Sequence, residues 1–482
     1  MASRGGVAVM AAEDSGLGGF VSTGVEGLQG KRVVVLGLSR SGAAAIDLLL
    51  DSGARVLGTD SRTEEAFGAD ARAWRDRGAT LSLGANPTDL AAGADLIVTS
   101  PGISARHPLL AAARDRGIPV WSELELGARA ARALIVALTG TNGKTTATHM
   151  TGAIFSAAGF PSAIAGNVGY PLSRAAREVP ASGRLAVEVS SYQLEWTEEF
   201  HPRVAVILNL TPDHLERHGD FEGYRRAKGR IFERMTADDT LVLVADDAAL
   251  DAYRREARCR ILDVSAVRRV ERGTWLEAGR LWARLDEREA APILDAAELR
   301  VPGAHNVTNA LAAAAATLAA GAPLEAVRGA LARFESLPHR LEPVAEVNGV
   351  RLVNDSKSTN VDSLLVALRS YSRPVVLIAG GRDKETPLGE VAALLRERAR
   401  GAVLIGEAAD RFEAAFRDAT TTLRADSLES ATRAALDLAQ PGDTILLSPA
   451  CASFDMFRDY EHRGDAFREI ACRIAAERSK PS

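Results

Sequence analysis

A glycine-rich stretch in the second quarter of the chain offers the clearest chemistry. "TGTNGKTT", residues 139–146, directly follows the apolar run "ALIVAL". A strand that leads through such a loop into a helix typically presents converging backbone N–H groups and a helix N-terminus to a phosphate. Lys144 can then reach the outer phosphates of a nucleotide, and the Thr145 hydroxyl can bind Mg²⁺. The stretch predicts a nucleoside triphosphate site, although Leu138 stands where the standard motif has its first glycine.

Groups that could hold a metal follow the next two predicted strands. Glu188 lies in "VEVSSYQLE", His214 and His218 lie in "DHLERHG", and Lys228 lies in "YRRAKGRIF". The carboxyl ends of parallel strands form the ligand-binding edge of a sheet, so Glu188 is a candidate second Mg²⁺ ligand. Taken singly, each of these residues is better interpreted as a solvated or structural side chain. Their density after successive strands favours a site.

Three polar stretches nearer the C-terminus would rim a second sheet edge. They are "NDSKSTN" (354–360), "GGRDK" (380–384) and "SPACASFD" (448–455), each after a predicted strand. Lysines at such an edge bind carboxylate or phosphate groups as point charges. Three ordinary polar loops are the alternative, which is hard to sustain when all three share one edge. Asn306 and Asn309 fall on one face of a predicted helix, where they could bind an adenine or ribose or cap the helix.

The first predicted strand is followed by a weaker phosphate-binding pattern. "GLSRSG", residues 37–42, follows "RVVVLG", and Asp60 ends the next strand. Ser39 replaces the middle glycine of the dinucleotide-binding fingerprint, where backbone must approach a pyrophosphate closely. The pattern is therefore weak support for NAD. It predicts either a helix N-terminus that binds a phosphate or a strand-to-helix turn that needs small residues.

These groups require a framework of alternating strands and helices. Apolar strand-like runs alternate with helical patterns over most of the 482 residues, which is typical of α/β domains with parallel sheets. Three sets of strands are predicted, at 32–37, 55–60, 96–100 and 118–122, then at 133–139, 184–190, 204–210 and 240–245, and finally at 351–356, 374–380, 402–406 and 444–449. Residues from about 260 to 302 predict a small antiparallel patch, followed by an alanine-rich helix over about 305–320.

The predicted fold class is α/β with three domains. The division is a flexible N-terminal tail over 1–28, a Rossmann-like domain over 29–128, a P-loop ATPase-like central domain with a parallel sheet plus the antiparallel patch over 129–337, and a Rossmann-like C-terminal domain over 338–482. The last boundary rests on "SLPHRLEPV", whose two prolines flank a polar pair. The tail lacks a basic start followed by a long apolar run, so no signal peptide is expected.

Composition argues against several classes of partner. The formal net charge is −5, which gives no electrostatic reason to expect nucleic acid or an anionic membrane. No apolar run approaches the roughly 20 residues needed to cross a bilayer. Cys259, Cys451 and Cys472 show neither zinc nor disulfide spacing, which suits a reducing cytosol. Cys451 is rejected as a nucleophile because no histidine stands near it in the sequence.

The motifs, in their order along the chain, resemble the Mur ligase family from about residue 31 to 470. They are "GTNGKTT", "GNVG", "EVSSYQLE", "DHLERHG", "YRRAKGRIF", "HNVTNA", "LPHRLE", "NDSKSTN", "GGRDK" and "SPACASFD". The last three are the most specific, and they most resemble members that add D-glutamate. The resemblance implies a cytoplasmic step of peptidoglycan synthesis. ATP, with Mg²⁺, would convert the carboxylate of UDP-N-acetylmuramoyl-L-alanine into an acyl phosphate, which the D-glutamate amine attacks; a monomer is expected.

The resemblance also implies a role for each matching residue. Those implied to bind ATP are Gly140, Thr141, Asn142, Gly143, Lys144, Thr145, Thr146, Asn306, Asn309, Arg340 and Asp355. Those implied to bind the UDP substrate are Arg40, Ser41, Ser61, Arg62, Gly102, Asn167 and His214, and those for D-glutamate are Lys357, Thr359, Lys384, Ser453 and Tyr460. The implied metal ligands are Thr145, Glu188, His214 and Lys228, the lysine carrying a carbamate formed from CO₂. The implied catalytic groups are Lys144, Glu188, His214, Lys228 and Lys357.

Two positions depart from the family pattern, and three other functions stay open. Ser39 stands where many members have glycine, and Tyr460 stands where an apolar aromatic is familiar. A ligase for another amino acid, or a folylpolyglutamate synthase, would keep the chemistry and differ in amine specificity. A P-loop binding module would tolerate replacement of Lys228 and Lys357. An NAD-dependent oxidoreductase would use the first domain, which the missing glycine disfavours.

Overall fold

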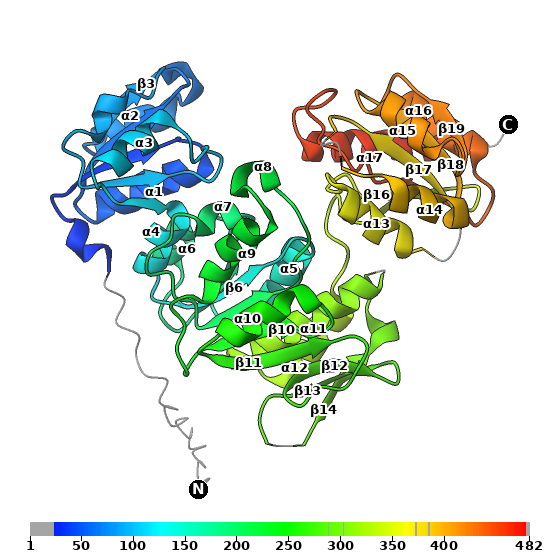
Figure 1. Ribbon diagram of the computed structural model, residues 1–482, viewed down its shortest axis with the longest axis horizontal. Helices are drawn as coiled ribbons and strands as arrows, with labels where there is room; N and C mark the ends of the chain where they lie inside the picture. The colour runs from blue at the N-terminus through cyan, green and yellow to red at the C-terminus, as the bar shows by residue number, and fades with distance from the viewer. Residues whose placement is uncertain (1–23, 288, 302, 372–373, 384–385, 479–482) are drawn as a thin grey trace, which may run out of the picture.

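Three α/β sheets follow one another along the chain (Figure 1). The structure is a computed structural model that describes residues 24–287, 289–301, 303–371, 374–383 and 386–478. Residues 1–23 of the predicted tail lie outside the described residues. The rest of that tail includes the 3-10 helix η1 (Val25–Leu28), whose Leu28 is buried in the core of the first sheet. The N-terminal and C-terminal sheets flank the central one (Figure 1).

The first sheet is parallel throughout, with the order β3-β2-β1-β4-β5. Its strands are β1 (Arg32–Leu36), β2 (Arg55–Asp60), β3 (Thr80–Leu83), β4 (Leu96–Thr99) and β5 (Val120–Ser122), and its helices are α1 (Arg40–Asp51), η2 (Glu64–Ala66), α2 (Ala69–Asp76), η3 (Thr88–Ala91) and α3 (Pro108–Asp115). The chain turns back between β1 and β4, so the loop after β1 lies at the switch point where α/β sheets bind ligands.

The central sheet has nine strands in the order β14-β13-β12-β11-β10-β9-β6-β8-β7. They are β6 (Leu134–Thr139), β7 (Ser162–Gly166), β8 (Arg184–Glu188), β9 (Val204–Ile207), β10 (Thr240–Val244), β11 (Arg260–Ser265), β12 (Gly273–Glu277), β13 (Arg280–Arg284) and β14 (Ala291–Asp295). The predicted antiparallel patch over 260–302 is wrong in one respect. β11 and β12 continue the parallel sheet, and only the β12–β13 and β13–β14 pairs are antiparallel. The helical segment over 248–256 between β10 and β11 returns the chain so that β11 lies parallel to β10, whereas the two-residue turn at 278–279 makes β12 and β13 an antiparallel hairpin.

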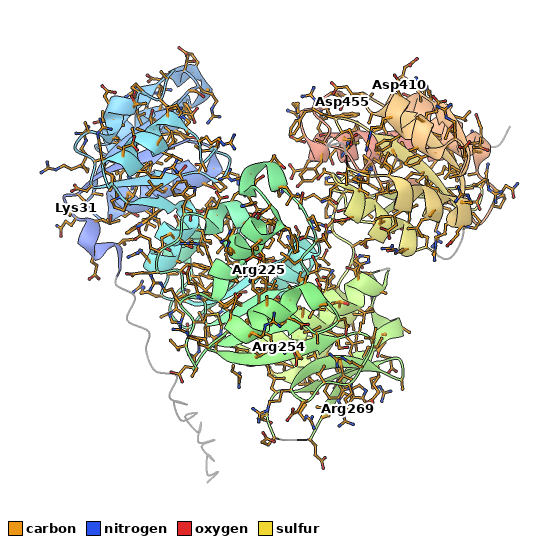
Figure 2. All side chains as sticks on the ribbon, in the orientation of Figure 1. Lys31, Arg225, Arg254, Arg269, Asp410 and Asp455 are labelled. Atoms are coloured by element: carbon orange, nitrogen blue, oxygen red, sulfur yellow. The ribbon has the colours of Figure 1, made fainter. Side chains whose placement is uncertain are left out.

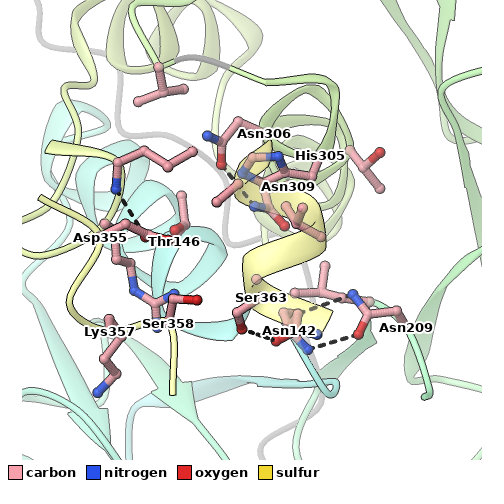
Figure 3. Close-up of a pocket in the computed structure, with 18 of the residues that line it drawn as sticks. Asn142, Thr146, Asn209, His305, Asn306, Asn309, Asp355, Lys357, Ser358 and Ser363 are labelled. Atoms are coloured by element: carbon pink, nitrogen blue, oxygen red, sulfur yellow. Dashed lines mark hydrogen bonds between the residues drawn. The ribbon is translucent and has the colours of Figure 1, made fainter. Parts of the chain in front are cut away.

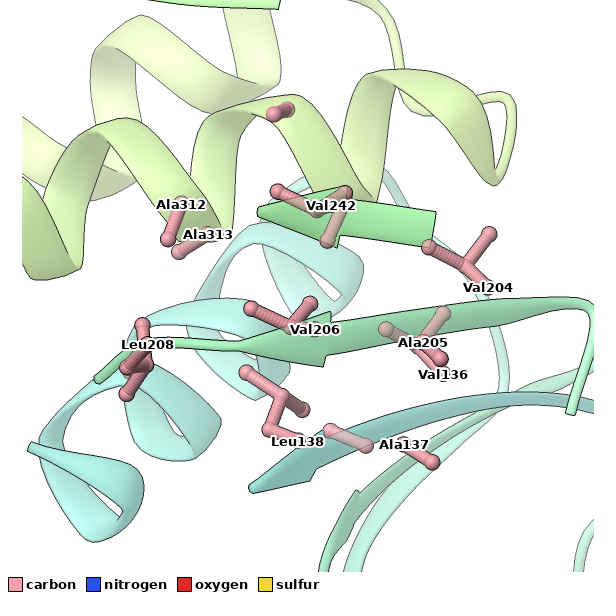
Figure 4. Packing of buried hydrophobic residues seen from close by; sticks show 14 of the residues in the cluster. Val136, Ala137, Leu138, Val204, Ala205, Val206, Leu208, Val242, Ala312 and Ala313 are labelled. Carbon is pink, nitrogen blue, oxygen red and sulfur yellow. The ribbon is translucent and has the colours of Figure 1, made fainter. Parts of the chain in front are cut away.

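The helices around the central sheet position the side chains of interest. They are α4 (Glu123–Ala130), α5 (Lys144–Ala157), α6 (Leu172–Glu178), α7 (Ser191–Leu194), α8 (Leu215–His218), α9 (Phe221–Gly229), η4 (Arg230–Phe232), η5 (Ala248–Leu250), α10 (Asp251–Glu256), η6 (Ala296–Glu298), α11 (Ala304–Ala319) and α12 (Leu324–Arg333). In α11, residues 310–316 are all fully buried. Their small side chains let the helix lie close to the sheet, where Figure 4 shows Ala312 and Ala313 above Val206 and Leu138.

Ion pairs brace helix α9 from its solvent side. Arg225 pairs with Glu222 on the same helix and with Glu256 of α10, and Arg254 of α10 pairs with Asp263 of β11. Figure 2 places Arg225 and Arg254 over the central sheet. The Tyr253 hydroxyl also donates to the Arg225 carbonyl at 2.6 Å. Helix α9, which carries Lys228, is therefore tied to its neighbours at several points.

The third sheet has the order β15-β16-β20-β17-β18-β19, parallel except for β15. Its strands are β15 (Glu342–Val347), β16 (Val350–Asn354), β17 (Val375–Gly380), β18 (Ala399–Ile405), β19 (Thr421–Arg424) and β20 (Thr444–Leu447), and its helices are α13 (Val361–Arg369), α14 (Gly389–Arg398), α15 (Ala409–Phe416), α16 (Leu428–Leu438) and α17 (Tyr460–Arg478). Among the described residues, no helix combines the length and hydrophobicity needed to cross a membrane.

Candidate active site

The glycine loop after β6 forms the centre of the site. Gly140 and Gly143 have φ angles of 152° and 82°, which favour glycine. A Cβ on Gly143 would also lie 2.5 Å from Asn309 Oδ1 of α11, so the loop and that helix meet without room for a side chain. Helix α5 begins directly after the loop at Lys144, which aims its first N–H groups at the loop.

Two lysines share one carbonyl of this loop. Lys144 Nζ donates to the carbonyls of Gly140 at 2.8 Å and Thr141 at 2.7 Å, and Lys228 Nζ donates to the same Gly140 oxygen at 2.8 Å. Burial lowers the pKa of Lys144. Burial, reinforced by the neighbouring Lys144 charge, holds the pKa of Lys228 well below its usual range. Both effects shift Lys228 towards its neutral amine, because a second ammonium would be repelled at this buried position.

An asparagine from the next strand fixes the loop's backbone. Asn209 Oδ1 accepts from the N–H groups of Thr141 at 3.0 Å and Asn142 at 2.8 Å, and Asn209 Nδ2 donates to the Asn142 carbonyl at 3.1 Å. The Thr141 hydroxyl donates to the Thr211 carbonyl at 3.1 Å and lies 3.1 Å from the Tyr224 hydroxyl. The loop is thus held in shape by β9 and α9 rather than by a ligand.

Glu188 lies at the end of β8 with one oxygen held and the other free. Its Oε1 accepts from Asn167 Nδ2 at 2.7 Å, while Oε2 is buried with no hydrogen-bond partner among the described residues. The Asn167 N–H donates to the Glu188 carbonyl at 2.9 Å, so Asn167 holds this residue twice. A buried carboxylate oxygen in this state is costly unless a cation or donor binds it.

His214 stands after β9 in a constrained conformation. Its φ is 54°, an uncommon left-handed value for a residue other than glycine, and its Nδ1 lies 2.9 Å from the Tyr192 hydroxyl. Within the described part of the chain, no cluster of three or more His, Cys, Asp and Glu side chains is gathered as a ready metal site. The predicted ligand set contains only two such residues, Glu188 and His214, so a metal would also need the Thr145 hydroxyl and a modified Lys228.

The C-terminal domain closes over the loop through direct contacts. Arg340 Nη2 donates to the Thr145 hydroxyl at 2.6 Å, the Ser363 hydroxyl donates to Asn142 Oδ1 at 3.0 Å, and the Thr211 hydroxyl donates to Asp362 Oδ2 at 2.7 Å. Figure 3 shows Asn142 between Ser363 on one side and Asn209 on the other. The two domains therefore meet at the loop through side-chain hydrogen bonds.

A cavity of about 270 Å³ lies between these domains. Its lining brings together eight of the predicted ATP and D-glutamate residues, namely Asn142, Gly143, Thr146, Asn306, Asn309, Arg340, Asp355 and Lys357. Asn309 Nδ2 donates to Asn306 Oδ1 at 3.0 Å, in keeping with their predicted position on one helix face (Figure 3). Burial raises the pKa of Asp355 to about 7.

Of the predicted D-glutamate residues, Tyr460 contacts Lys357 directly. Lys357 Nζ lies 3.7 Å from the centre of the Tyr460 ring, and burial, with the nearby Arg340 charge, lowers the pKa of Lys357 to about 8. Ser453 is buried and Thr359 half-buried at the same end of the third sheet. Lys384 lies outside the described residues.

The predicted UDP-substrate residues line the first sheet's switch point and the neighbouring domain. Arg62 binds Asp60 with two hydrogen bonds and reaches the Ser39 hydroxyl at 3.1 Å. Arg40 Nη2 crosses to the central domain and donates to the Gly169 carbonyl at 2.7 Å, in the loop that carries Asn167. Ser61 and Gly102 are exposed, and Ser41 is half-buried.

Sequence reasoning missed several residues that shape the site. Asn209, Tyr192, Tyr224 and Ser363 contact the predicted residues directly. Asn209 lies near the end of the predicted strand 204–210, as Glu188 lies near the end of 184–190, so the signal that drew attention to Glu188 was present. The tyrosines and Ser363 lie on helices, where nothing in their spacing distinguishes them from ordinary packing residues.

A glycine loop with a buried lysine, set against a second α/β domain across a shared cavity, is the arrangement typical of P-loop proteins. Family models agree on all three parts of the chain. The Mur ligase MurD-like N-terminal domain matches residues 31–122, the Mur ligase middle domain matches 138–317, and the Mur ligase glutamate ligase domain matches 339–451.

Curated relatives match nearly the whole chain. A UDP-N-acetylmuramoylalanine–D-glutamate ligase from Koribacter versatilis is 40% identical over 94% of this chain and 100% of its own length. One with the same name from Pelotomaculum thermopropionicum is 42% identical over 91% of this chain and 97% of its own. The chain belongs to the Mur ligase family, which confirms the resemblance predicted from its motifs.

A solved structure supports the fold. A pseudomurein peptide ligase type C from Methanothermus fervidus covers 92% of this chain and 100% of its own at a TM-score of 0.59 and 20% identity. At that identity the likeness concerns the fold alone. It agrees with the predicted succession of three α/β units.

Proposed function

We propose that the chain is an ATP-dependent ligase that joins D-glutamate to UDP-N-acetylmuramoyl-L-alanine in peptidoglycan precursor synthesis. The relatives named for this activity support the substrates. The observation that carries the proposal is one cavity lined by Asn142 and Gly143 of the P-loop and by Lys357 of the C-terminal domain. A nucleotide held by the first two residues would face an amino acid held by the third.

The metal ligands predicted from the family resemblance fit the geometry around the loop. The buried, unpartnered Oε2 of Glu188 is suited to a cation, and Thr145 offers a hydroxyl that now accepts from Arg340. Thr145 and Glu188 would hold one Mg²⁺, and His214 and a carbamylated Lys228 would hold a second. Bound there, the cations would offset negative charge on the phosphate and acyl oxygens.

Lys228 has the surroundings needed to take up CO₂. Lys228 is 1% exposed and shares the Gly140 carbonyl with Lys144, and both features lower its pKa towards the neutral amine that reacts with CO₂. The nitrogen lone pair attacks CO₂ to form a carbamic acid, which loses a proton and becomes an anion. The change turns a repelled cation into a carboxylate-like ligand, beside a lysine and a metal that it attracts.

The reaction needs activation because a carboxylate lacks a good leaving group. A carboxylate oxygen of the UDP substrate attacks the γ-phosphorus, and ADP leaves. The D-glutamate amine then attacks the acyl carbon, phosphate leaves, and the amide forms with loss of a proton from nitrogen. Lys144 and Arg340, both beside Thr145 at the loop, would bind the phosphates as charge builds on them. Holding three substrates in register supplies roughly 7–11 kcal/mol of the barrier.

The amino-acid pocket would be built around the Lys357 ammonium. D-Glutamate carries two carboxylates, which suit Lys357 and Lys384, with Thr359, Ser453 and Tyr460 as neighbouring contacts. The UDP end of the second substrate would lie on Arg40, Ser41, Ser61, Arg62 and Gly102, with Asn167 and His214 toward the reacting end. We also assign the domains to 29–128, 129–337 and 338–482, and infer a cytoplasmic monomer that uses neither nucleic acid nor membrane.

Phosphate release tests this function directly. Purified protein with ATP, Mg²⁺, bicarbonate and UDP-N-acetylmuramoyl-L-alanine would be given D-glutamate, L-glutamate, L-lysine, D-alanine or no amino acid. Sustained release and a new amide by mass spectrometry are expected only with D-glutamate. Release with another amine would move the specificity, and no release with any amine would overturn the proposal.

A further inference from the structure

A row of three rings lies beside the side chains proposed for the second cation. The His218 ring is centred 5.9 Å from Tyr192 and 5.4 Å from Tyr224, both in tilted contact; these three rings are the ring row. Tyr192 contacts His214, with ring centres 4.9 Å apart. At the other end, Lys228 Nζ lies 4.8 Å from the centre of the Tyr224 ring. His218 thus stands midway between His214 and Lys228.

Ser191 and Glu195 flank the two nitrogens of the middle ring. His218 Nε2 lies 3.0 Å from the Ser191 hydroxyl in a hydrogen bond, and His218 Nδ1 lies 3.2 Å from Glu195 Oε1, within ion-pair distance. The His218 side chain is 3% exposed, so these two residues and the flanking tyrosine rings enclose it inside the protein. The ring therefore has little room to change its position.

The contacts from Ser191 to His218 and from His218 to Glu195 resemble a hydrolase triad. Burial of Ser191 excludes that role. Ser191 is 3% exposed, and its hydroxyl does not line the cavity between the domains. A nucleophile must be reached by its substrate before a neighbouring base can matter. The arrangement holds side chains in place.

The same carboxylate connects the ring row to the N-terminal domain. Arg217 gives Glu195 three hydrogen bonds of 2.6–3.1 Å, and its guanidinium lies 4.0 Å from the centre of the Tyr192 ring. Arg217 Nη1 donates across the domain boundary to the Ile103 carbonyl at 3.3 Å. Ile103 follows Gly102, one of the residues predicted to bind the UDP substrate.

We propose that His218, enclosed between Tyr192 and Tyr224 and beside Glu195, is a positioning residue for the second cation site. It sets His214 and Lys228 through the two tyrosines that flank it. This inference rests on the proposed carbamate at Lys228. It changes His218 from a candidate metal ligand into a supporting residue, and it gives Glu195 a role that the sequence did not. Loss of such outer support typically lowers metal affinity or activity by about 10- to 100-fold.

Carbamate NMR and Mg²⁺ titration of the full chain test the inference. The variants are His218→Ala, which removes the ring, and His218→Phe, which keeps a ring without nitrogens. His201→Ala is the matched control, because His201 also pairs with a buried acid, Asp239 at 2.6 Å, but precedes β9 whereas His214 follows it. The first readout is the carbamate carbon signal after addition of ¹³C-bicarbonate without ATP. The second is the Mg²⁺ concentration that gives half-maximal rate.

With His218→Ala, we expect loss of most of the carbamate signal and about a tenfold higher Mg²⁺ requirement. With His218→Phe, both readouts should stay within about threefold of the original protein because the ring contacts remain. The inference would be overturned if His218→Ala kept the carbamate signal and Mg²⁺ requirement of the original protein. It would also be overturned if His218→Phe or the control His201→Ala lost as much as His218→Ala. Absence of the carbamate signal from the original protein would instead overturn the proposed second cation site itself.

Discussion

Two glycine loops in this chain look alike in sequence and differ in what binds them. Each follows a buried parallel strand and opens a helix, at residues 37–42 in the first domain and 140–144 in the central one. A side chain from the neighbouring strand end binds the loop's N–H groups in both. In the first domain it is the carboxylate of Asp60, at 2.7 Å from the Leu38 nitrogen. In the central domain it is the neutral amide of Asn209.

The two side chains differ in charge. Asp60 places a negative charge against the Leu38 N–H group, and it also binds Arg62. Asn209 shapes its loop without adding charge, so the helix dipole and Lys144 remain available to an anion. One N–H group of the first loop is therefore already occupied by a carboxylate. A phosphate in that domain would have to use side chains around the loop, such as Arg40 and Arg62.

Removing the loop lysine should have the largest effect. Lys144→Ala deletes the lysine that donates to two carbonyls of the central loop, and we expect phosphate release to fall by on the order of 10²–10³-fold. Lys31→Ala is the matched control, since Lys31 is half-exposed at the start of the first domain (Figure 2). Turnover of the Lys144 variant within tenfold of the control would contradict the assignment of the loop.

A carboxylate beside the central loop, like Asp60 beside the first loop, should have the second-largest effect by weakening nucleotide binding. Asn209→Asp keeps the size and one acceptor but adds a negative charge beside the phosphates, which should lower ADP affinity by about 10- to 100-fold. Calorimetric titration measures this directly. Asn348→Asp makes the same charge change in the turn between β15 and β16 and should leave affinity unchanged. If Asn209→Asp and Asn348→Asp bind ADP with equal affinity, charge does not account for the difference between the two loops.

Packing of the first loop supplies a third test. A Cβ on Gly42 would lie 1.9 Å from the Gly37 carbonyl oxygen, so Gly42→Ala should lower the free energy of unfolding by about 1–3 kcal/mol. Gly389→Ala has no atom within 4 Å of its added Cβ and is the control. Denaturant titration would compare them. Unchanged stability in Gly42→Ala would show that Gly42 does not pack against the Gly37 carbonyl as closely as described.

The smallest expected effect is the loss, at acid pH, of the contribution that Asp60 makes to the free energy of unfolding. Burial alone would raise its pKa, but Arg62 and the Leu38 and Arg62 N–H groups lower it from 3.8 to about 2. A lowered carboxyl pKa stabilises the fold above the unfolded value and is lost as pH falls through the folded one. Asp60→Asn should thus cost about 1 kcal/mol at pH 7, since Arg62 is half-exposed and screened, and progressively less from pH 4 towards 2. Urea unfolding against the exposed Asp89→Asn variant tests this; a pH-independent difference would argue against it.

The strands absent from the sequence prediction share a position. β3, β7, β15 and β19 all lie at sheet edges. An edge strand is paired on one side only, so small or polar residues suffice, as "SAIAG" in β7 and "TTLR" in β19 show. The interior strands were predictable because both of their faces are covered by helices and must be apolar.

Motifs likewise indicated the residues proposed to touch ligands more readily than those proposed to support them. The P-loop and the Asn306–Asn309 pair were visible because their chemistry depends on local spacing. Asn209 and His218 were visible only as polar groups after predicted strands, because the loop and the rings that they contact belong to separate elements. Contacts of this kind become evident only once the sheet order is known.

The alanine-rich helix α11 has a thermodynamic consequence for the cavity. Its buried residues 310–316 are alanines apart from Leu311, and alanine has no side-chain rotamers to lose on folding. The wall that carries Asn306 and Asn309 is therefore ordered at little entropic cost. A nucleotide entering the cavity meets a surface that is already fixed, so its contacts with that wall add to affinity instead of restricting the protein.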